Sequence, residues 1–312
     1  MMSVSNFQAV YLKLNDSGRF DERIEKLYKI LEKCSLCPRN CQVNRLNKQK
    51  GFCRSTDEVV VTSVGPHFGE EKELVGIGGS GTIFLSNCNL RCIYCQNYDI
   101  SHLGEGQIQG EEQLAQSMLY LQGIGCHNIN LVTPTQFSPQ LVKAIKIAIE
   151  LGLKLPIVYN CGGYENVETI KLLEGIIDIY MPDIKYSHKD MAERFSQALD
   201  YFQKAKEAVL EMHRQVGDLE IVDGIARRGL LIRHLVLPND ISGSKEVLEF
   251  IANEVSKDTY VNIMDQYRPE YEANKFPELS RRITEKEYNR VIEMAQNLGL
   301  HRGFEKISKR LF

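Results

Sequence analysis

Between residues 80 and 265, short β-branched apolar runs alternate with stretches in which apolar residues recur at helical spacing. The runs that predict strands are TIFLS (82–86), NINLVT (128–133), LPIVY (155–159), IIDIYM (176–181), LLIRHLV (230–236) and TYVNIM (259–264). This alternation is typical of βα units around a parallel sheet. Six strands are too few for a closed eight-stranded barrel. We therefore predict an α/β fold with a partial (β/α)6 barrel; a doubly wound sheet is the alternative.

Local signals place individual helices. The stretch EEQLAQSMLYLQG (111–123) carries apolar residues at i, i+4 and i+7, as one face of a helix does. Ser244 is a candidate N-cap for a helix over 244–256. Thr284 and Glu287 have the spacing of a capping box, which predicts a helix in the C-terminal tail.

The βα rhythm also divides the chain into parts. We predict an N-terminal segment with a four-cysteine module (1–75), the partial barrel (76–270) and a C-terminal helical tail (271–312). Nothing in the pattern suggests internal repeats or a Pro- or Gly-rich linker.

Composition narrows the class of protein. The chain has 312 residues, 43% of them hydrophobic, which is enough for a large core. The net charge of -3 predicts no nucleic-acid partner, and no apolar run approaches the roughly 18 residues of a membrane helix. The N-terminal residues MMSVSNFQAVYLKLNDSGRF lack the apolar region of a signal peptide, so we expect a cytoplasmic protein. In a reducing compartment, clustered cysteines more often hold metal than form disulfides.

The stretch SNCNLRCIYCQNYDIS (86–101) contains the most informative cluster, Cys88, Cys92 and Cys95, in the spacing C-x3-C-x2-C. It follows the first predicted barrel strand, and active sites of parallel barrels lie at the carboxyl ends of the strands. Three thiolates can bind three irons of a 4Fe-4S cluster and leave the fourth iron open, whereas structural clusters usually have four. The alternatives are a zinc site completed by His102 or a remote group, and three unrelated buried thiols.

A second cluster precedes the barrel. Cys34, Cys37, Cys41 and Cys53 lie in CSLCPRNCQVNRLNKQKGFC and supply enough thiolates for a closed metal site. Either zinc or an iron–sulfur cluster fits such a set. Because the segment has little apolar content, we expect a metal to help it fold.

The spacing C-x3-C-x2-C, with Tyr94 just before the last cysteine, resembles the signature of the radical S-adenosylmethionine (SAM) superfamily. More closely, the chain resembles the pyruvate formate-lyase activating enzyme-related group. The segments that carry this resemblance are CSLCPRNC, GSGTIFLSNCNLRCIYCQNYDIS, NINLVTPTQF, YMPDIKY, RRGLLIRHLVLP and NIMDQYRP. They extend from residue 34 to about residue 305.

The resemblance implies an oxidoreductase that cleaves SAM with one electron from the cluster at Cys88, Cys92 and Cys95. The products are methionine and a 5′-deoxyadenosyl radical, which abstracts hydrogen from a substrate. It also implies a reducing partner such as flavodoxin or ferredoxin. We expect a protein or peptide substrate, as for a glycyl-radical activase. A small-molecule substrate and a non-catalytic iron–sulfur electron carrier are the alternatives.

The resemblance further implies residues that contact SAM. Asp183 and Lys185 lie at i and i+2 after the fourth predicted strand and resemble the Asp-x-Lys of glycyl-radical activating enzymes. The alternative for this pair is an ion pair that closes the barrel. The expected contacts are Tyr94, Asn160, Asp183, Lys185 and Arg233. His234 points away from Arg233 in a regular strand and is expected to be structural.

Two positions depart from the family pattern. The Gly-Gly-Glu motif that holds the amino group of SAM is replaced by TPTQF, so Thr133 and Thr135 are its candidate substitutes. Cys161 stands where Ser or Thr is expected. It is an extra ligand, a hydrogen donor or an inert small residue, and we favour the inert role.

Overall fold

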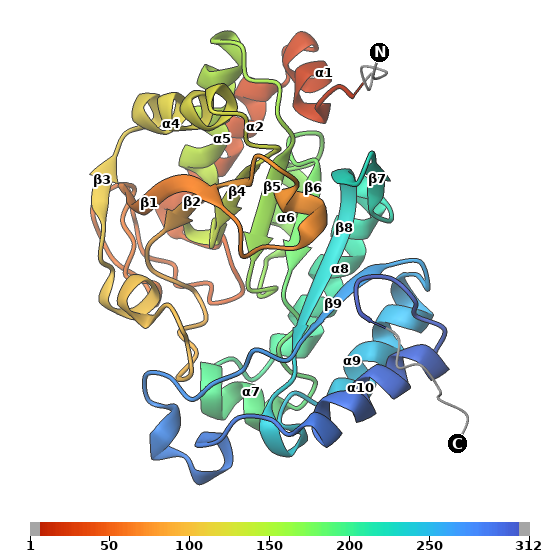
Figure 1. Ribbon diagram of the computed structural model, residues 1–312. Coiled ribbons are helices and arrows are strands. Elements are labelled where there is room, and N and C mark those ends of the chain that lie inside the picture. Colours follow the sequence, from red (N-terminus) through yellow and green to blue (C-terminus); the bar gives the residue numbers. More distant parts are fainter. Residues whose placement is uncertain (1–6, 306–312) are drawn as a thin grey trace.

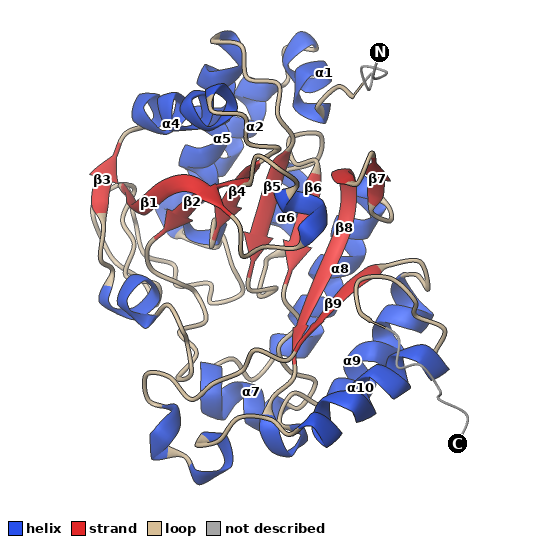
Figure 2. Ribbon diagram, in the orientation of Figure 1, coloured by secondary structure: helices blue, strands red, loops and turns tan. Residues whose placement is uncertain are grey.

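The centre of the molecule is an open sheet of parallel strands, shown in the computed structural model of residues 7–305 (Figures 1 and 2). Each strand pairs in parallel with the next along the chain. The six strands are β2 (Ser80–Leu85), β4 (Ile129–Val132), β5 (Ile157–Cys161), β6 (Ile179–Pro182), β8 (Ile225–Leu235) and β9 (Tyr260–Met264). They coincide with the six predicted strands, so the partial (β/α)6 barrel is confirmed.

Three further strands extend the sheet with antiparallel pairs. β1 (Val59–His67) pairs with β2, β3 (Gln107–Gln109) pairs with β1, and β7 (Glu220–Val222) pairs with β8. The βα rhythm did not predict them, because each is defined by its antiparallel partner in the sheet and not by the alternation of parallel strands and helices. β1 therefore places part of the N-terminal segment in the sheet itself.

Helices cover the outer surface of the sheet, as Figure 2 shows. The helices between parallel strands are α4 (Glu111–Gly123), α5 (Ser138–Glu150), α6 (Val167–Leu172), α7 (Lys189–Ser196), α8 (Tyr201–Val216) and α9 (Ser244–Phe250). The others are α1 (Val10–Asp16), α2 (Phe20–Ile30), α3 (Lys72–Val75) and α10 (Glu285–Asn297). Their apolar faces and the outer face of the sheet form the main core, and a smaller cluster that includes Leu74, Met181 and Leu231 fills the barrel interior.

The first helices attach to the barrel through a buried carboxylate. Asp178 precedes β6, and its two oxygens accept hydrogen bonds from the backbone N–H groups of Val10 and Ile157, each at 2.9 Å. Lys146 on α5 also pairs with Asp21 on α2. The division of the chain at residue 75 stays a prediction, but these contacts make residues 10–30 part of the barrel's outer layer.

The predicted cap at Ser244 is wrong. Gly243 precedes α9 without a side-chain cap, and the Ser244 hydroxyl instead lies 2.8 Å from His234 Nε2. The capping box of α10 is confirmed, with Thr284 and Glu287 each bonding the other's backbone N–H.

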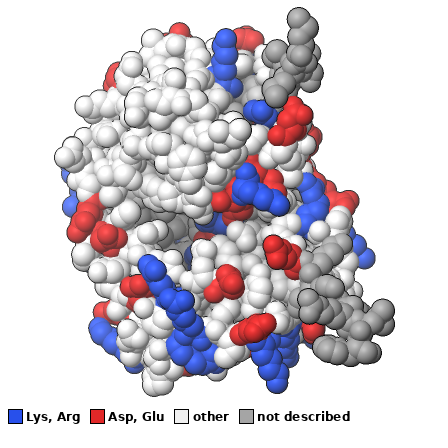
Figure 3. All heavy atoms as spheres, viewed as in Figure 1, with Lys and Arg blue, Asp and Glu red and all other residues white. Residues whose placement is uncertain are grey.

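None of the helices within residues 7–305 combines the length and apolar character that crossing a bilayer requires. Figure 3 shows charged side chains of both signs intermixed over the lower and right-hand parts of one face, while its upper left is largely uncharged. Neither sign of charge dominates this face.

Candidate active site

The three clustered cysteines lie on the loop after β2, at the carboxyl end of the sheet. Cys88, Cys92 and Cys95 all line one cavity of about 160 Å³. The loop is held from outside, because the backbone N–H of Ile93 donates to the carbonyl of Phe195 at 2.9 Å. The barrel therefore presents the three thiols to a common space.

Each of these sulfur atoms accepts a hydrogen bond. The Ser196 hydroxyl lies 3.0 Å from Cys92 Sγ, and the Ser101 hydroxyl lies 3.2 Å from Cys95 Sγ. The backbone N–H of Leu90 lies 3.4 Å from the third sulfur, that of Cys88. Donors aimed at sulfur favour thiolates and tune iron–sulfur clusters, so this donor set fits a cluster.

Burial raises the pKa of the thiols of Cys88, Cys92 and Cys95. Free thiols here are therefore protonated at neutral pH, and binding iron has to displace their protons. The arrangement couples cluster loading to proton release.

Four of the five predicted SAM contacts line the same cavity: Asn160, Asp183, Lys185 and Arg233. They come from the ends of three neighbouring strands, β5, β6 and β8. Such convergence of polar groups at strand ends is what a bound ligand requires. That they contact SAM stays a prediction.

Arg233 connects the other polar groups of the cavity. Its Nε lies 2.8 Å from Asp183 Oδ1 and its Nη2 lies 2.7 Å from Asn160 Oδ1. Lys185 pairs with the second oxygen of Asp183. Burial alone would raise the pKa of Asp183, but Arg233 and Lys185 outweigh it and hold the pKa below its usual value. Asp183 is therefore ionised and the site has a fixed array of charges.

A glycine allows the loop after β5 to approach Asp183. Gly163 has φ +77°, and a Cβ there would lie 2.0 Å from the Asp183 carbonyl oxygen. Only glycine accepts both that conformation and that contact. Gly163, three residues after Asn160, thus allows close backbone packing at the cavity wall.

Tyr94 is placed differently from the other predicted contacts. It is buried among aromatic rings, with Tyr186 and Tyr267 edge-on at centroid distances of 6.3 and 5.9 Å. Its ring supports the cysteine loop from behind, and a contact of its backbone with SAM stays a prediction.

The two histidines discussed from the sequence lie outside the cavity. His102 Nδ1 lies 2.8 Å from the Ser101 hydroxyl, which in turn contacts Cys95. His234 is fully buried between the Ile184 carbonyl (2.7 Å) and Ser244, which agrees with a structural role.

The candidate substitutes for Gly-Gly-Glu separate in space. Thr133 lines the cavity with a φ of 61°, whereas the Thr135 hydroxyl donates to Glu165 at 2.6 Å. Burial raises the pKa of Glu165 to about 7. Cys161 lines the cavity beside this carboxyl group. The sequence analysis missed Glu165, because only the fold brings it against Thr135.

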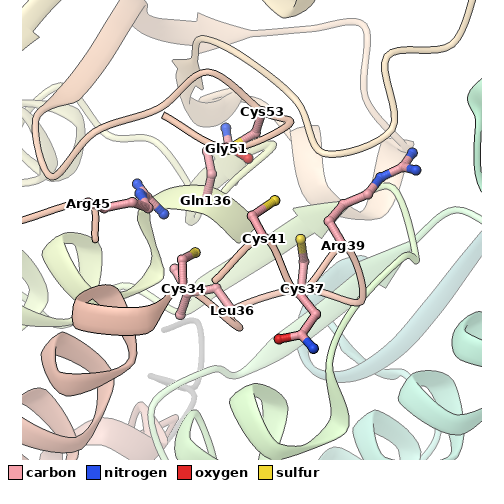
Figure 4. Close-up of a pocket in the computed structure, with 10 residues that line it drawn as sticks. Cys34, Leu36, Cys37, Arg39, Cys41, Arg45, Gly51, Cys53 and Gln136 are labelled. Atoms are coloured by element: carbon pink, nitrogen blue, oxygen red, sulfur yellow. The ribbon is translucent and has the colours of Figure 1, made fainter. Parts of the chain in front are cut away.

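The N-terminal cysteines form a second cluster of thiols. Cys34, Cys37, Cys41 and Cys53 line one pocket, with Arg45 on its left and Arg39 on its right in Figure 4. Among residues 7–305, no three His, Cys, Asp or Glu side chains are positioned to share a single metal ion. This holds for both sets of cysteines, so a metal at the N-terminal set is not shown.

Comparisons with known proteins agree with the fold and with the position of the cysteines. Residues 82–226 match the family described as the Radical SAM superfamily, which includes β2, the cysteine loop and the strands up to the start of β8. This part of the chain is a radical SAM superfamily domain. Such a domain implies a 4Fe-4S cluster and SAM as cofactors, and the donor set described above fits that cluster.

Two relatives match over most of the chain. The chain is 32% identical over 304 residues to uncharacterized protein MJ0674 of Methanocaldococcus jannaschii, covering 95% of this chain and 83% of that protein, and belongs with it in one family. It is 24% identical to uncharacterized protein MJ0808 of the same organism, over 91% and 82% of the two chains.

The fold also occurs among solved structures. HydG, a maturase of the FeFe-hydrogenase, superimposes with a TM-score of 0.50 at 16% identity and covers 71% of this chain. The chain spans 49% of the length of HydG. At this identity the likeness concerns the barrel alone.

Proposed function

We propose that this protein is a radical SAM enzyme that abstracts hydrogen from a protein or peptide, in the manner of a glycyl-radical activase. The observation that carries the proposal is one cavity lined by three thiols and by four polar side chains from neighbouring strand ends. A 4Fe-4S cluster bound there supplies the electron that cleaves SAM.

The chain's own residues provide binding and orientation. Arg233 and Lys185 offer positive charge to the carboxylate of SAM, while Asp183 and Asn160 fix the direction of the guanidinium. A ligand held by fixed charges in a buried site needs little reorganisation to react. Leu90 and Phe84 complete the wall and exclude water.

The proposal includes components outside the cavity. A protein electron donor such as flavodoxin or ferredoxin reduces the cluster, and the enzyme works in the cytoplasm. We also propose that Cys34, Cys37, Cys41 and Cys53 bind a second metal centre, zinc or iron–sulfur, because they line a single pocket.

A small-molecule substrate is the second candidate, and one observation favours it. The segment around α3 contacts the last strand, β9, although it connects β1 with β2. Glu71 Oε1 lies 2.7 Å from Asn262 Nδ2, and Glu73 Oε2 lies 2.6 Å from the Tyr260 hydroxyl. The open side of the barrel is therefore bridged at this level, which narrows the lateral path for an extended peptide.

Isotope transfer distinguishes the candidates. The reduced protein is incubated anaerobically with SAM and deuterium-labelled cell fractions separated by molecular weight. We expect deuterium in 5′-deoxyadenosine from the macromolecular fraction and a glycyl signal in electron paramagnetic resonance. Label from the small-molecule fraction alone would favour the second candidate. Absence of SAM cleavage after reduction would leave only an electron carrier.

A further inference from the structure

The N-terminal four-cysteine pocket contains a buried cation without a counter-ion. Arg45 lines the pocket and is 1% exposed. Its Nε and Nη2 donate to the Thr56 carbonyl, while Nη1 has no hydrogen-bond partner. Within residues 7–305, no carboxylate forms an ion pair with it. A buried uncompensated charge is costly, so an anionic group in the pocket is expected.

Thiols alone do not provide that negative charge. Four thiolates around zinc or a 4Fe-4S core carry a net negative charge, which Arg45 can offset. The geometry of the cation therefore points to a metal–thiolate group.

The loop around Cys41 is shaped for a thiolate. The backbone N–H of Phe52 lies 3.3 Å from Cys41 Sγ, as donors do at the sulfurs of the barrel cavity. Gly51 lies so close that a Cβ there would be 2.7 Å from the same sulfur. Only glycine lets the backbone close over Cys41.

The thiol arrangement favours a cluster over one ion. Zinc requires all of its ligands to converge on a single point. Among the described residues no three thiols do so, neither here nor at Cys88, Cys92 and Cys95, where the superfamily cofactor is a 4Fe-4S cluster. In such a cluster each thiolate binds its own iron, so the ligands stand farther apart.

Two side chains connect this pocket to the loop of the barrel cysteines. Gln136 lines the pocket, and its Nε2 donates to the carbonyls of Ser86 and Asn87, at 3.0 and 3.2 Å, directly before Cys88. Its Oε1 is buried and has no partner. These carbonyls fix the orientation of the amide, because a flipped amide would set oxygen against oxygen.

Arg39 makes the second connection. It lies between Cys37 and Cys41, and its Nε donates to the carbonyl of Asn89 at 2.8 Å, directly after Cys88. Its guanidinium is stacked 3.7 Å from the ring centroid of Phe52. Single side chains from the N-terminal pocket thus contact the backbone on both sides of Cys88.

We propose that Cys34, Cys37, Cys41 and Cys53 bind a second iron–sulfur cluster of the 4Fe-4S class, with Arg45 as its buried counter-charge. This inference rests on the metal binding proposed above and specifies its chemistry. It adds Arg45 and Gln136, which have no role in the barrel cavity, to the functional residues.

Metal analysis and spectroscopy of the anaerobically reconstituted full chain test the proposal. A chain with two 4Fe-4S clusters contains about eight irons. Cys41→Ala should leave about four irons and a signal that SAM perturbs, whereas Cys92→Ala should leave about four that SAM does not perturb. Cys126→Ala is the matched control, because this buried cysteine lies outside both sites, and it should keep both clusters.

Arg45→Gln addresses the case in which Cys41→Ala does not fold. Loss of the positive charge should make the reduction potential of the second cluster more negative, and Arg45→Lys should restore it. An unchanged potential overturns the counter-charge role. If zinc is found in place of the second cluster, the 4Fe-4S assignment is wrong but the four cysteines still form a metal site. A wild-type chain with one cluster and no zinc overturns both. A wild-type chain that holds two clusters, neither of which SAM perturbs, would refute the proposed function instead.

Discussion

Asp183 and Arg233 form an ion pair with 2.8 Å between Oδ1 and Nε, at the end of β6 and beside the last residues of β8. The pair is largely buried, with side chains 13% and 18% exposed. Because Lys185 also contacts Asp183, one carboxylate serves two cations. Arg233 Nη1 also lies 3.5 Å from Glu70 Oε2. The two cations therefore face two carboxylates before any ligand binds.

Asp183→Asn tests whether this pair serves SAM. Removing one partner of a buried, hydrogen-bonded charge pair costs about 2–5 kcal/mol, or roughly 30-fold or more in affinity. We expect weaker SAM binding with unchanged cluster content, measured by titrating the SAM-induced change in the cluster spectrum. The exposed Asp258→Asn is the control. Lower unfolding stability with unchanged affinity would show that the pair only closes the barrel.

Cys92→Ala tests the ligand set of the barrel cluster. Because three thiolates hold this cluster, losing one should abolish both its SAM-sensitive signal and SAM cleavage. Product analysis of 5′-deoxyadenosine after reduction measures the second effect. Cleavage that survives in this variant would exclude the mechanism, provided that Cys126→Ala behaves as wild type.

Ser196→Ala tests the hydrogen bond to Cys92, whose sulfur lies 3.0 Å from the hydroxyl. Donors to cluster sulfurs stabilise the reduced, more negative state. The variant should therefore bind its cluster but show a more negative midpoint potential in a redox titration. The exposed Ser280→Ala should leave the potential unchanged. Equal potentials in the wild type and both variants would leave the Ser196 hydroxyl only its hydrogen bond with the Tyr186 hydroxyl, 2.9 Å away.

Glu165→Gln tests the buried carboxyl group. Its pKa is about 7 in the folded chain against an ordinary value of 4.5. Between these pH values the unfolded chain binds fewer protons than the folded chain, so unfolding free energy falls as pH rises. The shift corresponds to about 3 kcal/mol at most. Between pH 5 and 7.5, the unfolding free energy of Glu165→Gln should therefore fall by up to about 3 kcal/mol less than that of the wild type.

Denaturant unfolding at the two pH values measures this difference, with the exposed Glu150→Gln as the control. If both variants follow the wild-type dependence, Glu165 does not ionise in this range. The Thr135 hydroxyl at 2.6 Å would then be its dominant partner.

Features fixed by local sequence were predicted correctly. The six parallel strands are continuous apolar runs, which are buried whatever their pairing register. The short spacing of Cys88, Cys92 and Cys95 predicts that they share one loop. The capping box of Thr284 and Glu287 also depends only on neighbours. These features required no knowledge of distant contacts.

Features created by distant contacts were missed. The β1 strand is defined by its pairing with β2, and the Ser244 hydroxyl is taken by His234 ten residues away. Arg45 looks like an ordinary surface residue in the sequence, since only the folded pocket shows that its charge is buried. A basic residue within a cysteine-rich segment is too common a pattern to signal this.

The Arg39 side chain also sets an order of assembly. It donates to the carbonyls of Asn89, Ser196 and Gln197, the last of which comes 158 residues later in the chain. During translation these acceptors emerge long after the guanidinium that they bind. The contacts by which Arg39 ties the N-terminal cysteine segment to the barrel can therefore form only after the chain up to Gln197 has left the ribosome.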